Sequence, residues 1–275
     1  MRYGLGALQL ALYRTADDGG YSKAGAVAYS FILSLFPFCI FLGALAGTIG
    51  GRELAATAVD QLFQAVPENV AKALAPEVEK VMGRTQPGLV TVGAAIALFF
   101  ATSAIESLRA ALNTAYGVRE GRSYLFCLLQ SLFFVFATAA GMLVLAWGVV
   151  VGPVLASQGR WELIGWIFDH GLLSPASRYA IVAAVTMAQL LAYHLWLAAG
   201  HRTLWDVWPG VMLSVLLWIA AGWIYSWWLT VSDYSIFYAG LTQLFTALIF
   251  FQVSSLIMIF GAEFNRALAE LRAGG

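Results

Sequence analysis

The chain has 275 residues, of which 61% are hydrophobic and only 11% are charged. An ordinary soluble domain carries roughly 25% charged residues. The composition therefore excludes a soluble domain and indicates a membrane protein. The 15 basic and 15 acidic side chains cancel, which leaves no excess positive field for RNA or DNA and excludes nucleic acid as an expected partner. Cys39 and Cys127 lie in apolar runs, which predicts small buried side chains rather than a disulfide framework or a zinc site.

The N-terminus begins with a short apolar run over residues 3–13. Leu5, Leu8 and Leu12 recur near the helical period, and no small-residue cleavage pattern follows. The run is too short to span a bilayer, so it predicts a helix lying in the inner membrane interface.

Six later intervals are free of charged side chains for long enough to cross a bilayer, since about 20 helical residues span its hydrocarbon core. The third interval should end at Gly152-Pro153, because proline lacks an amide donor and disfavours helix in the residue before it. The fifth should begin at Pro209, where a lost amide costs little. The predicted spans are about 24–50, 86–105, 124–152, 179–200, 209–232 and 238–262.

The connection between the first two spans, residues 52–84, has apolar residues at helical spacing on both sides of Pro67. It predicts amphipathic helices that cover the outer surface. The predicted fold class is therefore all-α: one integral membrane domain over residues 1–275, with six transmembrane helices, an N-terminal interfacial helix and amphipathic outer-loop helices. Nine of the 15 basic residues fall on the side of the two termini, which predicts that both termini are cytoplasmic.

The first polar feature is AYSFILSLFPFCIF, residues 28–41, in which Pro37 interrupts a membrane-grade helix. Ser30 and Ser34 precede it and can donate to carbonyls three or four residues back, which repairs part of the disturbed backbone. Tyr29 shares a helical stripe with Pro37 at a spacing of two turns. The kink either aids packing alone or lines a substrate path.

The second polar feature is ESLRAALNTAYGVREGR, residues 106–122, where the second span leaves the membrane. Glu106, Arg109 and Asn113 share one helical face, and the first two can form an ion pair. That face is either an interfacial ion pair or the polar wall of a cavity.

The third polar feature is FGAEFNRALAE, residues 260–270, at the end of the sixth span. Gly261 permits close helix approach, and Glu263, Asn265 and Arg266 then follow at the inner edge. Because the second and third features reach the same side of the membrane, we predict a Glu263–Arg109 pair. Its counterpart is a Glu106–Arg266 pair.

No P-loop, HExxH, metal-spaced cysteine pair or G-x-S-x-G motif occurs in the chain. The sequence therefore predicts no nucleotide hydrolysis, no catalytic or metal-binding residues and no cofactor.

The motifs Ala28-Tyr29, Ser34-Leu35-Phe36-Pro37, NTAYGV and Gly261-Ala262-Glu263-Phe264-Asn265 resemble those of the YihY/BrkB family of bacterial inner-membrane proteins. Ser30 is a departure, because many relatives carry a second aromatic residue there. The resemblance covers nearly the whole chain and implies a multi-pass protein of the bacterial inner membrane. The family carries an old ribonuclease label, names tied to virulence or serum resistance, and proposals that members move lipids or other amphiphiles.

Three functions follow as hypotheses. The first is a transporter or flippase for lipids or other amphiphilic solutes, which expects a cavity along the first span and the polar ends of the second and sixth spans. The second is a non-transporting scaffold of an envelope complex, which expects a tightly packed bundle without a cavity. The third is an enzyme acting on RNA or lipid, for which the sequence shows no site. Membrane lipids and an amphiphilic substrate are the expected partners. Whether the chain forms a homo-oligomer is not decided by the sequence.

Overall fold

The computed structural model describes residues 2–34, 87–146, 175–231 and 242–273, and every regular element in these ranges is a helix. Five of the described helical segments are long and apolar enough to cross a membrane, which confirms the all-α, polytopic fold class. Of the first predicted span, the structure describes the beginning, which lies in a helix over residues 20–34. Pro37, Cys39 and the predicted outer loop 52–84 lie outside the described residues. The other elements are α1 (Arg2–Asp17), α4 (Pro87–Ala115), α5 (Tyr124–Ala146), α8 (Pro175–Ala192), the π-helix η2 (Tyr193–Leu197), α9 (Leu204–Val231) and α11 (Thr242–Ala273).

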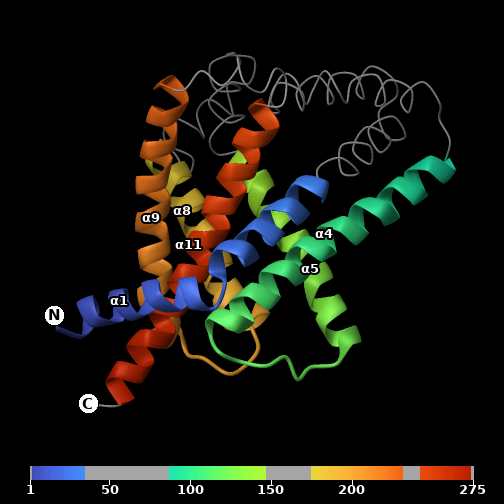
Figure 1. Cartoon of the computed structure of the whole chain (residues 1–275). Coiled ribbons are helices and arrows are strands. Elements are labelled where there is room, and N and C mark those ends of the chain that lie inside the picture. Colours follow the sequence, from blue (N-terminus) through green and yellow to red (C-terminus); the bar gives the residue numbers. More distant parts are fainter. Residues whose placement is uncertain (1, 35–86, 147–174, 232–241, 274–275) are drawn as a thin grey trace.

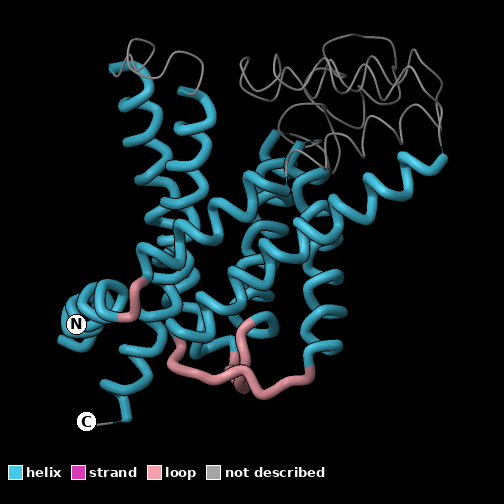
Figure 2. The backbone as a smooth tube through the Cα atoms, turned by 45° about the vertical axis from the view of Figure 1, so that its right-hand side comes forward, coloured by secondary structure: helices cyan, strands magenta, loops and turns pink. Residues whose placement is uncertain are grey.

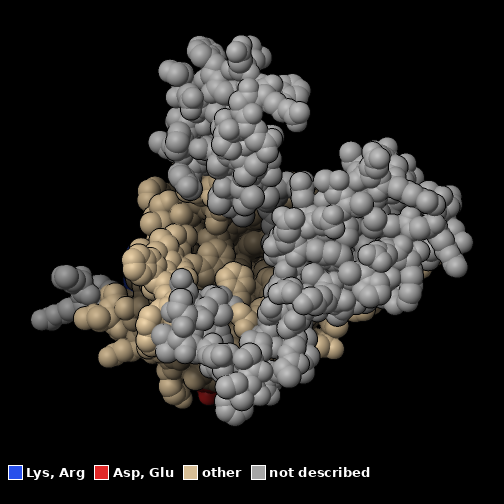
Figure 3. All heavy atoms as spheres, turned by 90° about the horizontal axis from the view of Figure 1, so that it is seen from above, with Lys and Arg blue, Asp and Glu red and all other residues tan. Residues whose placement is uncertain are grey.

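Helix α11 is the centre of the arrangement, since it packs against α9, α1 and α4. Helix α5 packs against α4 and α8, and α8 packs against α9. Both chain termini and the connections 116–123 and 198–203 lie at one end of the bundle, the lower end in Figure 1 and Figure 2. We call this end the polar end. At the opposite end, few charged side chains show on the described surface (Figure 3).

Helix α1 packs along the last turns of α11. Ala7 and Ala11 are fully buried there, and Arg14 Nη2 donates to Glu270 Oε2 at 2.6 Å. Leu5 and Leu12 point outward, with 70% and 62% of their surface exposed. An outward apolar face on a helix beside the polar end is what a position in the membrane interface requires.

Four helices extend beyond their predicted spans. Helix α8 begins at Pro175, and helix α11 continues to Ala273. Helix α4 continues past residue 105 to Ala115, which keeps Glu106, Arg109 and Asn113 on one helical face as predicted. Helix α9 begins at Leu204, which places Pro209 inside the helix rather than at its start.

Candidate functional site

The predicted pair of Glu106 and Arg109 is present. Arg109 Nη1 donates to Glu106 Oε2 at 2.6 Å, and Arg109 Nη2 donates to Ser131 Oγ at 2.6 Å and to the Cys127 carbonyl at 2.7 Å. Ser131 Oγ in turn donates to Glu106 Oε1 at 2.6 Å. Arg109 is buried and Glu106 is partly exposed. This network joins α4 to α5. Of the two alternatives for the face with Glu106 and Arg109, an ion pair or a polar cavity wall, the structure shows the ion pair.

The end of α4 is fixed by glycine and by Asn113. Gly117 adopts φ +65°, and the amides of Gly117 and Val118 donate to the carbonyls of Thr114 and Asn113, which is the Schellman pattern of helix ends. Asn113 Oδ1 accepts from the amide of Ala199 at 2.7 Å. Asn113 thereby ties the end of α4 to the connection that follows η2.

Asn265 of α11 bonds to the backbone of α9 on either side of Pro209. Its Oδ1 accepts from the Gly210 amide at 2.6 Å, and its Nδ2 donates to the Val207 carbonyl at 3.0 Å. The two helices approach closely here, because a Cβ built on Gly210 would lie 2.1 Å from the carbonyl oxygen of Gly261. The predicted role of Gly261 in close helix approach is confirmed.

Tyr116 joins three segments of the polar end. Its hydroxyl lies 2.7 Å from His194 Nδ1 in η2 and accepts from Asn265 Nδ2 at 3.2 Å. The guanidinium of Arg202 sits 3.8 Å from the centre of the Tyr116 ring, within cation–π range. Burial raises the pKa of Tyr116 to about 12, so the phenol stays protonated and can donate to the imidazole. His194 is fully buried, and its Nε2 has no hydrogen-bond partner.

The two predicted cross-helix ion pairs are wrong. Arg109 is taken up by Glu106 and by groups of α5, so it does not reach Glu263. Arg266 instead lies 3.7 Å from Asp18 Oδ2 and 3.2 Å from Glu270 Oε1. The reason is the placement of α1, whose charged end occupies the space beside α11 that the prediction assigned to α4.

Glu263 is therefore left in an unusual state. The residue is fully buried, and neither of its carboxyl oxygens has a hydrogen-bond partner among the described residues. The charged groups around it are Asp18, Arg266 and Arg14. Burying a polar group without a bonded partner costs free energy, and Glu263 shares this state with Nε of Arg109 and Nε2 of His194.

Residues of the first predicted span behave partly as expected. Ser30 Oγ donates to the Ala26 carbonyl at 3.0 Å, and Ser34 Oγ donates to the Phe31 carbonyl at 2.7 Å, so the predicted back-bonding is confirmed. Ser30 also lies 3.2 Å from Ser107 Oγ of α4. Tyr29 is 59% exposed and points away from the bundle, which does not fit a place on an internal path. Pro37, the remaining candidate, is not among the described residues.

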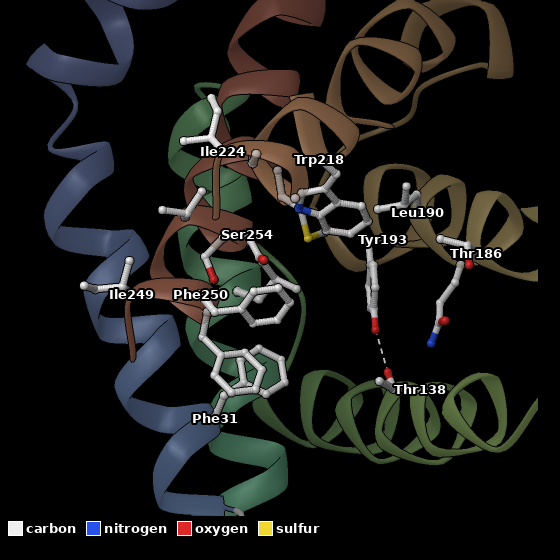
Figure 4. Close-up of a pocket in the computed structure, with 18 residues that line it drawn as sticks. Phe31, Thr138, Thr186, Leu190, Tyr193, Trp218, Ile224, Ile249, Phe250 and Ser254 are labelled. Atoms are coloured by element: carbon white, nitrogen blue, oxygen red, sulfur yellow. Dashed lines mark hydrogen bonds between the residues drawn. The ribbon is translucent and has the colours of Figure 1, made fainter. Parts of the chain in front are cut away.

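A cavity of about 870 Å³ lies between the helices (Figure 4). We call it the membrane cavity. Its lining comes from residues 20–34, α4, α5, α8, η2, α9 and α11, and is mainly apolar. Its mouth lies between α9 and α11, where Ile224, Phe250 and Val253 are 65%, 49% and 38% exposed. At bilayer depth such an opening faces lipid.

A few polar groups line the membrane cavity. The Tyr193 and Thr138 hydroxyls are 2.5 Å apart, as the dashed line in Figure 4 marks. Gln189 Nε2 and Trp218 Nε1 are buried donors without a hydrogen-bond partner among the residues that the structure describes. The cavity therefore combines apolar walls with unused donors, as pockets that orient an amphipathic ligand do.

Sequence reasoning missed Tyr116, Arg202 and Ser131. Tyr116 stands in NTAYGV, so that motif could have indicated it. The other two carry no local signal, because their roles depend on helices that meet only in the fold. The cavity lining was also missed, since Leu, Phe and Ile on a membrane helix look alike whether they face a cavity, a neighbour or lipid.

The fold and these sites define a polytopic helical membrane protein with a hydrogen-bonded polar end and an apolar cavity. The chain belongs to the BrkB virulence factor family, whose model matches residues 11–274. It is 26% identical over 260 residues to YfkH of Bacillus subtilis (strain 168), which is named as a ribonuclease-like protein, and the match covers 90% of each chain. No solved structure matches the chain.

Proposed function

We propose that this protein is a transporter or flippase that moves lipids or other amphiphilic molecules without hydrolysing nucleotide. In this proposal it lies in the bacterial inner membrane with both termini in the cytoplasm. The observation that carries the proposal is the membrane cavity. A void of about 870 Å³ falls in the roughly 300–1,000 Å³ range of pockets that bury small ligands, and native interiors rarely hold such a void without an occupant.

The chemistry of the cavity indicates the class of occupant. Its walls are apolar, so an acyl chain or another apolar body is the molecule that it solvates best. Its mouth at Ile224, Phe250 and Val253 opens to the side, so such a molecule can enter from the bilayer. The donors on Gln189 and Trp218 would bind a polar group of the same molecule.

The scaffold hypothesis expects a tightly packed bundle, and the membrane cavity does not favour it. Its predicted docking surface, the outer helices, lies outside the described residues. The ribonuclease-like name belongs to the relative YfkH, and we do not extend it to this chain.

Proteoliposomes with a fluorescent phospholipid in both leaflets test the proposal. A membrane-impermeant quencher reports how fast inner-leaflet lipid reaches the outside, with and without an imposed proton gradient. We expect faster movement than in protein-free vesicles. No movement of any lipid or amphiphilic solute, across a panel of headgroups and gradients, would overturn the proposal.

A cavity-filling variant ties movement to the membrane cavity. A Cβ on Gly222 of α9 would meet no atom within 4 Å, so Gly222→Phe should fold and place its ring at the mouth. We expect movement to slow several-fold. Ala220→Phe adds the same bulk to an exposed position of α9 that does not line the cavity, and it should move lipid like the wild type.

A further inference from the structure

A second cavity, of about 740 Å³, lies at the polar end, and we call it the end cavity. It is bounded by the connection 116–123, by α5, and by η2 with the connection 198–203. Its charged and titratable lining side chains are Arg119, Arg122 and His201, and no carboxylate lines it among the described residues. The lining therefore favours an anion.

Arg122 has a structural role at this cavity. It donates to both carboxylate oxygens of Glu120, at 2.6 and 2.7 Å, and to the carbonyls of Trp196 and Leu197. The Arg122 guanidinium lowers the pKa of Glu120 to about 2, so the two charges compensate each other over the physiological range. Arg122 thus holds the cavity wall and is not the free charge.

Arg119 is the free charge. It is exposed, it lines the end cavity, and it forms no hydrogen bond or ion pair with any other described residue. An arginine fork without a carboxylate partner suits a phosphate group, which it can bind through two parallel N–H donors. His201 lines the same cavity, is exposed and is likewise unpaired within the described part of the chain.

The apolar side of the end cavity indicates where the phosphate comes from. Phe126, Phe133 and Trp196 line it and are 52%, 56% and 62% exposed. Exposed aromatic side chains beside a cationic group are typical of the membrane interface, where one end of a ligand is in lipid and the other in water. A lipid can therefore place its chains against these rings and its phosphate at Arg119.

The end cavity and the membrane cavity share a wall. Phe134 lines the end cavity and Tyr193 lines the membrane cavity, and their rings stack with centroids 5.2 Å apart. The sites for an anionic group and for an apolar body are thus separated by one pair of side chains.

We infer that the end cavity binds the phosphate of an anionic lipid headgroup, with Arg119 as its counter-charge. The inference rests on the proposed function in one respect: it names the class of amphiphile that the protein moves. The binding itself can be measured without transport.

Equilibrium binding to the delipidated full chain in detergent tests the inference, with phosphatidylglycerol and phosphatidylcholine as probes in native mass spectrometry. We expect tighter binding of phosphatidylglycerol, a loss of about fivefold in Arg119→Gln, and recovery in Arg119→Lys, since one basic residue near a lipid surface contributes about 1 kcal/mol. Arg272→Gln is the matched control, because Arg272 is exposed at the end of α11 and does not line the cavity. An unchanged lipid preference in Arg119→Gln would overturn the inference.

Soluble probes distinguish a lipid from a free anion. Inorganic phosphate and glycerol 3-phosphate should displace phosphatidylglycerol only weakly, because they lack the chains that contact the aromatic side. Displacement at concentrations similar to that of the lipid would mean a site for soluble phosphate and would overturn the lipid assignment. Arg119-dependent binding without lipid movement would defeat the proposed function alone, whereas lipid movement without Arg119-dependent binding would defeat this inference alone.

Discussion

The polar end and the membrane cavity are built from the same helices but follow opposite packing rules. At the polar end, α9 and α11 meet backbone to backbone at Gly210 and Gly261, and Asn265 bonds to the Gly210 amide and the Val207 carbonyl beside Pro209. Farther along, the same two helices diverge and leave a cavity whose donors on Gln189 and Trp218 are unused. The comparison indicates that the helices are fixed to one another at one end and separable at the other, which is a suitable arrangement for admitting a ligand from the side.

The largest effect is expected where the helices are in closest contact. Gly210→Ala would place a Cβ 2.1 Å from the Gly261 carbonyl oxygen and 2.5 Å from Asn265 Nδ2, so the helices must move apart. We expect a loss of about 3 kcal/mol or more in the free energy of unfolding, measured by denaturation in mixed micelles.

Gly222→Ala on the same helix is its control. The new methyl group meets no atom within 4 Å, and alanine favours helix over glycine, so stability should be unchanged or up to about 1 kcal/mol higher. Equal losses in both variants would contradict the contrast between the two regions.

The second largest loss of stability is expected when the Glu106–Arg109 network is broken. Arg109→Ala removes donors to Glu106, to Ser131 and to the Cys127 carbonyl. Removing one partner of a fully buried pair costs roughly 3–5 kcal/mol, and we expect about 2–3 kcal/mol here because Glu106 is 40% exposed. Thermal unfolding in detergent measures this loss. Arg119→Ala, which removes an arginine without a partner among the described residues, should leave the midpoint unchanged.

Asn265→Ala tests the bonds between α11 and the backbone of α9. It removes the bonds to the buried Gly210 amide and to the Val207 carbonyl, which should cost about 2 kcal/mol. Tyr116→Phe removes one further bond to the same amide group, so the double variant should lose less than the sum of the single losses. Strict additivity in a double-mutant cycle would count against a shared network.

Glu263→Gln should have the smallest effect on stability, and it should raise stability rather than lower it. The carboxyl group is buried without a hydrogen-bond partner, and a neutral amide costs less to bury than a carboxylate. Thermal unfolding at neutral pH should show a midpoint no lower than that of the wild type. A clear loss of stability would mean that the Glu263 carboxyl group makes a stabilising bond, and would contradict this prediction.

The bonds that polar side chains make within their own helix were predictable from the sequence, because these bonds depend only on nearby residues. Ser30 and Ser34 bond to carbonyls within one turn, and Glu106 pairs with Arg109 on the same helical face. The pairs across helices were not predictable, because Arg266 meets Asp18 only through the path of α1. An equal depth in the membrane does not determine which faces of two helices meet.

The sequence by itself determined that this is an all-helical membrane protein, roughly where most of its helices cross the bilayer, and which ends carry polar groups. Apolar length and the absence of charge fix these properties, because a backbone in lipid has few alternatives to helix. The tertiary structure alone decided that Asn265 bonds to α9 beside Pro209, that Glu263 has no hydrogen-bond partner in the described part of the chain, and that two cavities lie on either side of Phe134 and Tyr193. These features depend on the angles and distances at which helices pack, and apolar side chains of similar hydropathy do not encode whether they meet a neighbour or leave space for a ligand.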